Sequence, residues 1–119
     1  PCFFDEEGNL EAIDGVIDKD MSAALLGRIL KAEELFIITD VDNIFINFKQ
    51  PNEKPLIQTT VSEIEKCLAE GHFKRGTMEP KIRAALYFLK YHGEKVVITS
   101  INCIEGAIEG TQGTTIRND

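Results

Sequence analysis

The chain has 119 residues, of which 43% are hydrophobic and 28% are charged, and these values correspond to one compact domain. Its formal net charge is −7, from 13 basic and 20 acidic residues, so its surface as a whole repels nucleic-acid backbones and we expect no nucleic-acid partner. The apolar runs are far shorter than the ~20 residues that a membrane helix needs, so we expect no membrane segment.

The chain opens with patterns for a β-hairpin and a helix. Two β-prone segments, Cys2 to Phe4 and Leu10 to Ile13, flank an acidic turn and predict the hairpin. Apolar residues then recur at helical spacing from Met21 to Leu30, and Asp20 stands at the position of an N-cap. We therefore expect a helix that Asp20 caps.

The middle of the chain predicts two strands and a second helix. Leu35 to Thr39 and Ile44 to Phe48 are short β-rich runs separated by an acidic loop. Thr60 and Glu63 have the spacing of a capping box ahead of an apolar stripe, and Gly71 ends the helix that they begin.

The last part of the chain continues the alternation. Pro80 lies where a first helical turn tolerates proline, and an apolar stripe then runs to Gly93. A buried strand over Val96 to Thr99, a helix over residues 101–108 and a strand over Thr114 to Ile116 follow. The alternation predicts one α/β domain over residues 1–119, a three-layer sandwich with a largely parallel sheet.

The cysteines and histidines predict no catalytic triad and no metal centre. Cys2, Cys67 and Cys103 are widely spaced and form no CxxC pair, so we expect free thiols in a reducing, cytoplasmic compartment. His72 and His92 have no nucleophile motif beside them, and we expect both at the surface. No leader pattern precedes the first strand, so we expect no secretory signal.

Lys19 and Asp20 form the first candidate site, in the loop that leads into the first helix. Lys19 lies between the carboxylates of Asp18 and Asp20, which would hold its ammonium group in place and keep it charged for a phosphate. Asp20 could also orient a second lysine. The alternative is that Asp20 only caps the helix and Lys19 is solvated.

Two further polar loops stand at element ends, where an open α/β sheet places its ligands. Thr39, Asp40 and Val41 follow an apolar strand and could face an adenine and ribose, or a metal, although an ordinary polar turn is the alternative. Residues 76–81 run from a glycine into a helix start that carries Lys81, which suits a phosphate. The Walker A pattern occurs nowhere in the chain.

Four segments, taken in this order, resemble the carbamate kinase family. They are residues 12–21 (AIDGVIDKDM), 38–48 (ITDVDNIFINF), 70–73 (EGHF) and 76–81 (GTMEPK). The resemblance implies the amino acid kinase fold, with this chain as its C-terminal, nucleotide-binding half and the N-terminal half absent. It also implies the reversible reaction of ATP with carbamate to give ADP and carbamoyl phosphate, usually in arginine metabolism.

The resemblance further implies roles for the residues of these loops. Lys19 would contact the nucleotide phosphates, Lys81 would stabilise the transferring phosphoryl group, and Asp20 would orient both lysines. Magnesium would accompany the phosphates of ATP or ADP. The adenine nucleotide pocket would be lined by Thr39, Asp40, Val41, Phe45 and Met78. The family also suggests small-molecule substrates and a homodimer.

Three positions depart from the family pattern. Phe45 stands where the family usually has Tyr, and Thr77 where it usually has Ser, so the ring at position 45 is kept but its hydroxyl is lost. Glu79 adds negative charge two residues before Lys81, either near the phosphates or turned into solvent. We expect Lys81 to be exposed and to contribute little to folding.

Two other functions stay open at this stage. One is a fragment that binds adenine nucleotide without chemistry, and the other is an amino acid kinase that acts on a different acid. Because the family's other half carries its phosphate loops and carbamate site, we expect these 119 residues alone to bind nucleotide weakly without turnover.

Overall fold

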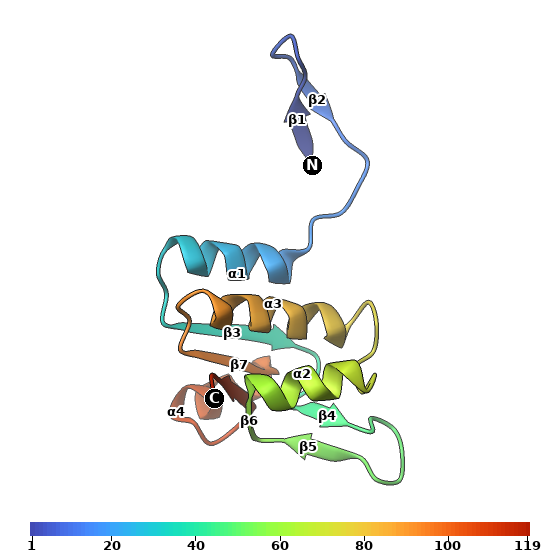
Figure 1. Ribbon diagram of the computed structural model, residues 1–119, viewed down its shortest axis with the longest axis vertical. Helices are drawn as coiled ribbons and strands as arrows, with labels where there is room; N and C mark the ends of the chain where they lie inside the picture. Colours follow the sequence, from blue (N-terminus) through green and yellow to red (C-terminus); the bar gives the residue numbers. More distant parts are fainter.

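The computed structural model describes residues 1–119, and Figure 1 shows a hairpin that projects from an α/β body. β1 (Cys2–Phe4) and β2 (Leu10–Ala12) pair antiparallel around the acidic turn. The Asp5 carboxylate closes this turn by accepting hydrogen bonds from the backbone N–H groups of Glu7 (2.9 Å) and Asn9 (2.8 Å). The predicted hairpin is therefore confirmed.

A four-stranded sheet forms the centre of the body. Its strands, in spatial order, are β3 (Glu34–Thr39), β7 (Lys95–Ser100), β8 (Thr114–Arg117) and β6 (Gln58–Thr60). β3 pairs parallel with β7, β8 pairs antiparallel with β7, and β6 pairs parallel with β8. The prediction of an α/β fold with a largely parallel sheet is confirmed.

Four helices surround this sheet (Figure 1). They are α1 (Lys19–Ile29), α2 (Val61–Ala69), α3 (Met78–Lys90) and α4 (Ile104–Glu109), the last preceded by a 3-10 turn at Ile101–Cys103. The capping box of Thr60 and Glu63 begins α2, as predicted. α3 packs on β7 and β3, whereas α1 packs on α3 and β3. No helix combines the length and the apolar character that crossing a bilayer requires.

The main core lies between α3 and one face of the sheet. Ile37 of β3, Ile98 of β7 and Phe88 of α3 are all buried there. Gly27 lets α1 approach α3 closely, because a Cβ atom at this position would lie only 2.8 Å from the Phe88 ring. The two helices that begin at the candidate site are therefore in close contact.

The sequence patterns missed two short strands and placed one strand end wrongly. β4 (Ile44–Ile46) and β5 (Lys54–Leu56) form an antiparallel hairpin, and neither β5 nor β6 was predicted. The strand predicted to reach Phe48 ends at Ile46, because Asn47 and Lys49 adopt positive φ angles of 53° and 59° and turn the chain. Strands of three residues offer too little alternation to be recognised.

Candidate functional site

The candidate site lies where β3 and β7 end and where α1 and α3 begin. β3 and β7 are parallel, so their carboxyl ends lie at the same edge of the sheet. α3 leads directly into β7 and packs along it, and α1 leads into β3 in the same way. The starts of both helices therefore meet the ends of both strands, which is where α/β sheets bind their ligands.

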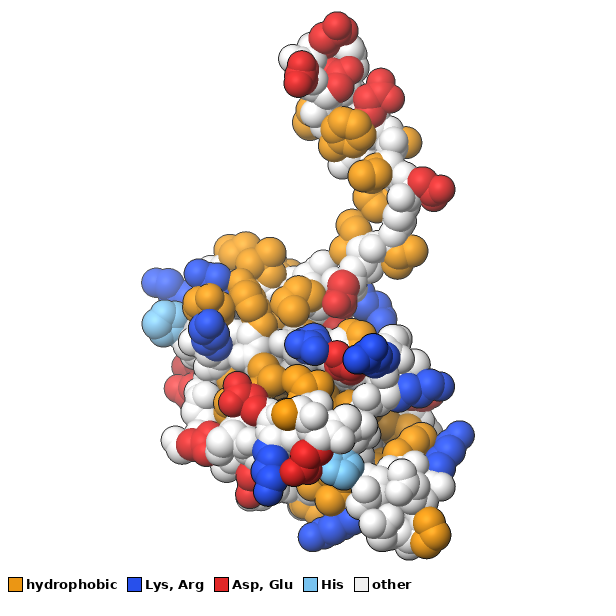
Figure 2. Space-filling model, turned by 45° about the vertical axis from the view of Figure 1, so that its right-hand side comes forward, with side chains coloured by type: hydrophobic (Ala, Val, Ile, Leu, Met, Phe, Trp, Pro, Cys, Tyr) orange, Lys and Arg blue, Asp and Glu red, His pale blue; other side chains and the backbone are white.

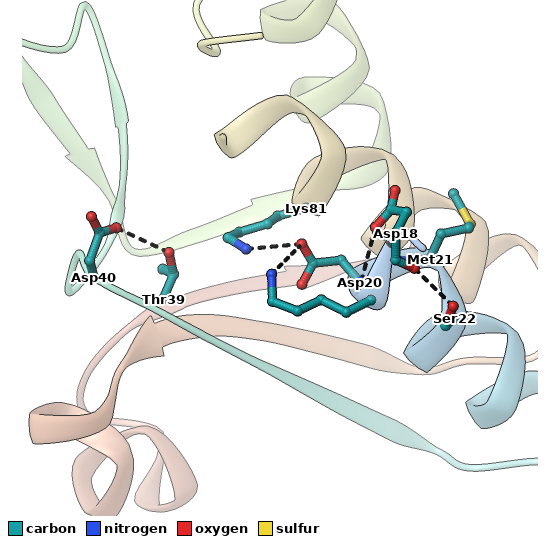
Figure 3. A network of polar contacts seen from close by, with 8 residues as sticks. Asp18, Asp20, Met21, Ser22, Thr39, Asp40 and Lys81 are labelled. Atoms are coloured by element: carbon teal, nitrogen blue, oxygen red, sulfur yellow. Dashed lines mark hydrogen bonds and ion pairs between the residues drawn. The ribbon is translucent and has the colours of Figure 1, made fainter. Parts of the chain in front are cut away.

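Two lysines share one carboxylate at this edge. The Nζ atom of Lys81 lies 2.9 Å from Oδ2 of Asp20, and the Nζ atom of Lys19 lies 3.8 Å from the same oxygen. Figure 3 shows the Lys81 ammonium group pointing at Asp20, with the Thr39 and Asp40 side chains beyond it. Asp20 thus holds the neighbouring Lys19 of its own helix together with Lys81 of α3, which lies 61 residues further along the chain than Asp20.

The helix cap is Asp18, so the prediction that Asp20 caps α1 is wrong. The Asp18 side chain accepts hydrogen bonds from the backbone N–H groups of Asp20 (3.0 Å) and Met21 (3.1 Å). α1 therefore begins at Lys19, two residues earlier than predicted. Because Asp18 satisfies the free N–H groups, the carboxylate of Asp20 is available for Lys81.

The expectation that Lys81 is exposed is also wrong. Lys81 as a whole residue is only 9% exposed, and the Asp20 side chain is 12% exposed. The Lys19 side chain, in contrast, is 82% exposed. Lys81 lies in the first turn of α3 on the side that faces α1, so the helix contact covers its aliphatic stem. One lysine of the pair is consequently fixed, and the other is free to move.

A cavity of about 650 Å³ opens on the side of this cluster where Thr39 and Asp40 lie, and Lys19, Asp20 and Lys81 are not among its lining residues. Its lining includes all five residues that were predicted to face an adenine nucleotide, Thr39, Asp40, Val41, Phe45 and Met78. Thr39 and Asp40 are joined by a hydrogen bond of 3.2 Å between their side chains, shown in Figure 3. The structure brings these residues together from the end of β3, from β4 and from the start of α3.

Sequence reasoning missed several residues of the cavity wall. His72, expected only at the surface, lines the cavity, and its Nε2 lies 3.2 Å from Oε2 of Glu70. Phe48 packs against Phe45 with ring centroids 5.8 Å apart, and the Nζ atom of Lys49 lies 5.5 Å from the Phe48 ring centroid. Phe48 and Lys49 reach the wall from the turn after β4, a part of the chain in which the sequence pattern had predicted strand as far as Phe48.

Asp42 ties the loop after β3 to the end of β7. Its carboxylate accepts a hydrogen bond of 2.5 Å from Oγ of Ser100, and its carbonyl accepts one of 3.3 Å from Oγ1 of Thr99. Hydrogen bonds from Ser100 and from the Cys103 thiol hold the pKa of Asp42 below its ordinary value. This anchor fixes the backbone of the loop that carries Thr39, Asp40 and Val41.

Thr77 and Glu79, which differ from the usual family residues, have different surroundings in the structure. Oε1 of Glu79 accepts hydrogen bonds from Nε (3.0 Å) and an NH2 nitrogen (2.7 Å) of Arg83, so its charge is neutralised within α3. Thr77 precedes α3 without a side-chain cap. Thr77 and Met78 both line the cavity, so the positive end of the α3 dipole lies at its wall.

Comparison with known proteins gives a consistent result. Residues 2–100 match the profile of the Amino acid kinase family. The chain is 44% identical over 111 residues to the carbamate kinase of Thermoplasma volcanium, and 41% identical over 117 residues to that of Trichomonas vaginalis. The resemblance to carbamate kinases stated from the sequence is confirmed.

The same similarity holds for the backbone. The solved carbamate kinase from Giardia lamblia bound to AMP-PNP superposes with a TM-score of 0.91 at 40% identity, covering 100% of this chain and 37% of that one. The matches cover 93% of this chain and 36% of the Thermoplasma volcanium protein, and 98% and 37% for the Trichomonas vaginalis protein. The chain therefore spans little more than a third of the length of these relatives.

Proposed function

The chain belongs to the amino acid kinase family, and from that premise we propose that it is the C-terminal, nucleotide-binding half of a carbamate kinase. The observation that carries this proposal is the pair of lysines held by Asp20 beside the cavity. The curated relatives that match at 41–45% identity are carbamate kinases. The carbamate kinase from Giardia lamblia, at 40% identity, was solved bound to AMP-PNP.

The proposed reaction is the transfer of a phosphoryl group between ATP and carbamate, in the reversible equilibrium that gives ADP and carbamoyl phosphate. Phosphoryl transfer asks a protein mainly for positioning and for positive charge at the phosphate oxygens. Lys81 supplies a fixed ammonium group, and Lys19 supplies a mobile one that can follow the phosphates. No protein nucleophile is needed, so the lack of a Ser or Cys triad is consistent with this reaction.

The cavity suits the rest of the nucleotide. Thr39, Asp40 and Val41 offer backbone and side-chain polar groups to the base and ribose, and Phe45 and Met78 offer apolar surface to the base. Phe45 lacks the hydroxyl of a tyrosine, so its contribution would be stacking alone. These assignments are roles for positions that the fold has gathered into one wall.

Magnesium fits this site only as a companion of the phosphates. No three His, Cys, Asp or Glu side chains gather anywhere in the chain in a group that could hold a metal ion. Mg²⁺ commonly binds through substrate phosphates and one or two carboxylates, and it would supply further positive charge to them. Asp40 and Glu70 are the carboxylates of the cavity wall that could take such a role.

The chain spans little more than a third of the length of its relatives, and this shapes the rest of the proposal. We infer that the N-terminal half, covalent or separate, completes the carbamate site, and that the working enzyme acts on small molecules in the cytoplasm as a homodimer. Arginine metabolism would be its setting. The alternative is a fragment that binds nucleotide without chemistry. Both hypotheses predict that these 119 residues alone bind nucleotide but do not turn over.

Calorimetric titration of the chain with ADP and with AMP-PNP, with and without Mg²⁺, tests the proposal. We expect measurable binding that Lys81→Met weakens at least tenfold. Lys90→Met, an exposed lysine at the other end of α3, is the matched control and should leave the affinity unchanged. Equal losses for both variants would show that only net charge matters.

Turnover gives the complementary measurement. We expect no carbamoyl phosphate-dependent ATP synthesis by the 119 residues alone. Activity of the isolated chain would contradict the requirement for a second half, whereas no nucleotide binding in any titration would contradict the proposed function itself.

A further inference from the structure

The chain has two hairpins that lie outside the four-stranded sheet, and they are held in different ways. The hairpin of β1 and β2 projects from the body, with hydrophobic and acidic side chains exposed along it (Figure 2). The hairpin of β4 and β5 lies against the body as a separate two-stranded sheet (Figure 1). Apart from their mutual pairing, neither β4 nor β5 packs broadly on another helix or strand. The position of the β4–β5 hairpin therefore depends on a few specific contacts.

The β4–β5 hairpin forms one wall of the cavity. Phe45 of β4 lines the cavity, and so do all the residues of the turn over residues 47–50. Glu53 braces this turn, because its Oε2 accepts a hydrogen bond of 2.6 Å from the backbone N–H of Lys49. The hairpin is thus held together at its turn. Its orientation relative to the body is set at the other end, where β4 begins and β5 ends.

The hydroxyl group of Thr114 lies at that end. Thr114 is the first residue of β8 and is fully buried. Its Oγ1 accepts a hydrogen bond of 2.8 Å from the backbone N–H of Ile44 and donates one of 2.5 Å to the carbonyl of Leu56. Ile44 and Leu56 face each other across the hairpin. One hydroxyl group therefore holds the first residue of β4 and the last residue of β5.

Asn43 connects this contact with the cavity. Its Nδ2 donates a hydrogen bond of 3.2 Å to the carbonyl of Leu56 and one of 3.5 Å to Oγ1 of Thr114. Asn43 lines the cavity, whereas Thr114 does not. One further hydrogen bond, of 2.9 Å from the backbone N–H of Thr115 to the carbonyl of Ile57, joins the end of the hairpin to β8. Thr114 thus reaches the cavity only through Asn43 and the hairpin.

We propose that Thr114 is a positioning residue, whose hydroxyl group sets the cavity wall that receives the nucleoside. The identity of the ligand rests on the proposed function, which assigns the nucleoside to the cavity and the phosphates to the lysine pair. Lys19 and Lys81 are held by Asp20 on α1 and α3, outside the cavity lining. The hairpin therefore bears on the nucleoside and leaves the phosphates to the two helices.

The physical reason lies in the groups that Thr114 pairs. Without its hydroxyl group, the N–H of Ile44 and one hydrogen bond of the Leu56 carbonyl lose their buried partner. An unpaired buried polar group is costly, so the base of the hairpin shifts to regain partners or water. The wall then moves as a unit with Phe45 and the turn. Affinity for the nucleoside should fall, and affinity for the phosphates should stay.

Calorimetric titration with ADP and with pyrophosphate tests the proposal. Thr114→Val keeps the shape of the side chain and removes its hydroxyl group. We expect it to raise the dissociation constant for ADP about fivefold or more and that for pyrophosphate, which has no nucleoside, by less than about twofold. Thr114→Ser keeps the hydroxyl group and should retain the parent affinity for ADP. Thr115→Val is the matched control, because its side chain lies on the other face of the sheet.

Amide hydrogen exchange without ligand gives a second readout. In Thr114→Val the amides of β4 and β5, that of Ile44 first, should exchange about tenfold faster, while those of β3 and β7 keep their parent rates. A purely structural role would accelerate exchange in both sheets. Equal acceleration in the two sheets, an unchanged rate at Ile44, or equal losses of ADP and pyrophosphate affinity would overturn the proposal.

Thr114→Ala covers the case in which valine prevents folding, because its smaller side chain leaves room for a water at the N–H of Ile44. We expect changes in the same direction as for Thr114→Val, but smaller. Loss of the fold in both variants, measured by circular dichroism, would show that Thr114 supports the whole body and would overturn the proposal. A parent chain that binds no ADP would defeat the proposed function, and the exchange rates alone would then decide whether Thr114 holds the hairpin.

Discussion

α1 and α3 start side by side at the same lysine pair, yet they are covered very differently. α3 lies against the sheet on one side and against α1 on another, and its residues Ile82, Ala85 and Phe88 are fully buried. α1 buries only its small residues and exposes its large ones. The helix that holds the fixed lysine is thus part of the core, and the helix that holds the mobile lysine is an outer layer.

This difference separates stability from assembly. The large apolar residues of α3 stabilise these 119 residues, because burial of apolar surface is what drives folding. The large apolar residues of α1 gain much less from the present fold, because Leu25, Leu26 and Ile29 remain 45–67% exposed. Substitutions in the two helices should therefore differ in the free energy of unfolding by far more than their similar residue types suggest.

The largest expected effect is at the centre of α3. Phe88→Ala removes a fully buried ring that packs against Gly27 and the sheet, and we expect it to lower the free energy of unfolding by about 3–5 kcal/mol. Urea denaturation followed by circular dichroism measures this loss. A loss below about 1 kcal/mol would mean that α3 is no better covered than α1.

The next effect is at the contact between the helices. Lys81→Met removes the partner of a nearly buried carboxylate, so we expect a loss of about 1–3 kcal/mol in unfolding free energy. The double variant Asp20→Asn with Lys81→Met should cost less than the sum of the single ones, because it leaves no unpaired charge. Strict additivity in urea denaturation would show that the ion pair contributes nothing to the contact.

A smaller effect is expected at the anchor below the β3 loop. The pKa of Asp42 is lowered from 3.8 chiefly by the Ser100 hydrogen bond, so its stabilising contribution is present above that ordinary value and is lost as pH falls through the lower folded pKa. Ser100→Ala should raise the pKa of Asp42 towards 3.8 and flatten the loss of stability in acid. Carboxyl carbon NMR titration of Asp42 measures the shift, and an unchanged pKa would remove Ser100 as the anchor.

The smallest effect is on the outer face of α1. Leu26→Ala replaces an exposed side chain with a residue of equal or better helix propensity, so we expect a change within about 0.5 kcal/mol. Urea denaturation in parallel with Phe88→Ala completes the comparison. A loss as large as that of Phe88→Ala would show that the α1 outer face is buried in solution, for instance in a dimer.

The sequence predicted the layers and the long elements well, because α1, α3, β3 and β7 have clear periodicities and the Thr60 capping box is local. The candidate site was harder to predict. Asp18 caps α1, and Asp20 pairs with Lys81 instead. The sequence pattern does not reveal this division, because the contact between Asp20 and Lys81 joins residues that are 61 positions apart.

Two other features also depended on long-range packing. The burial of Lys81 follows from the approach of α1, and the place of His72 in the cavity wall follows from the turn after α2. Neither leaves a periodic signal in the sequence. For His72, the only indication in the sequence was the resemblance of residues 70–73 to a family motif.

The projecting hairpin has a practical consequence, because it carries its own attachment point for a reporter. Cys2 in β1 is exposed, whereas Cys67 and Cys103 are half-buried, and burial raises the pKa of the Cys67 thiol so that less of it is thiolate at neutral pH. A maleimide dye should therefore label Cys2 first in the natural sequence. Its emission would then report the surroundings of the hairpin in real time, without an engineered cysteine.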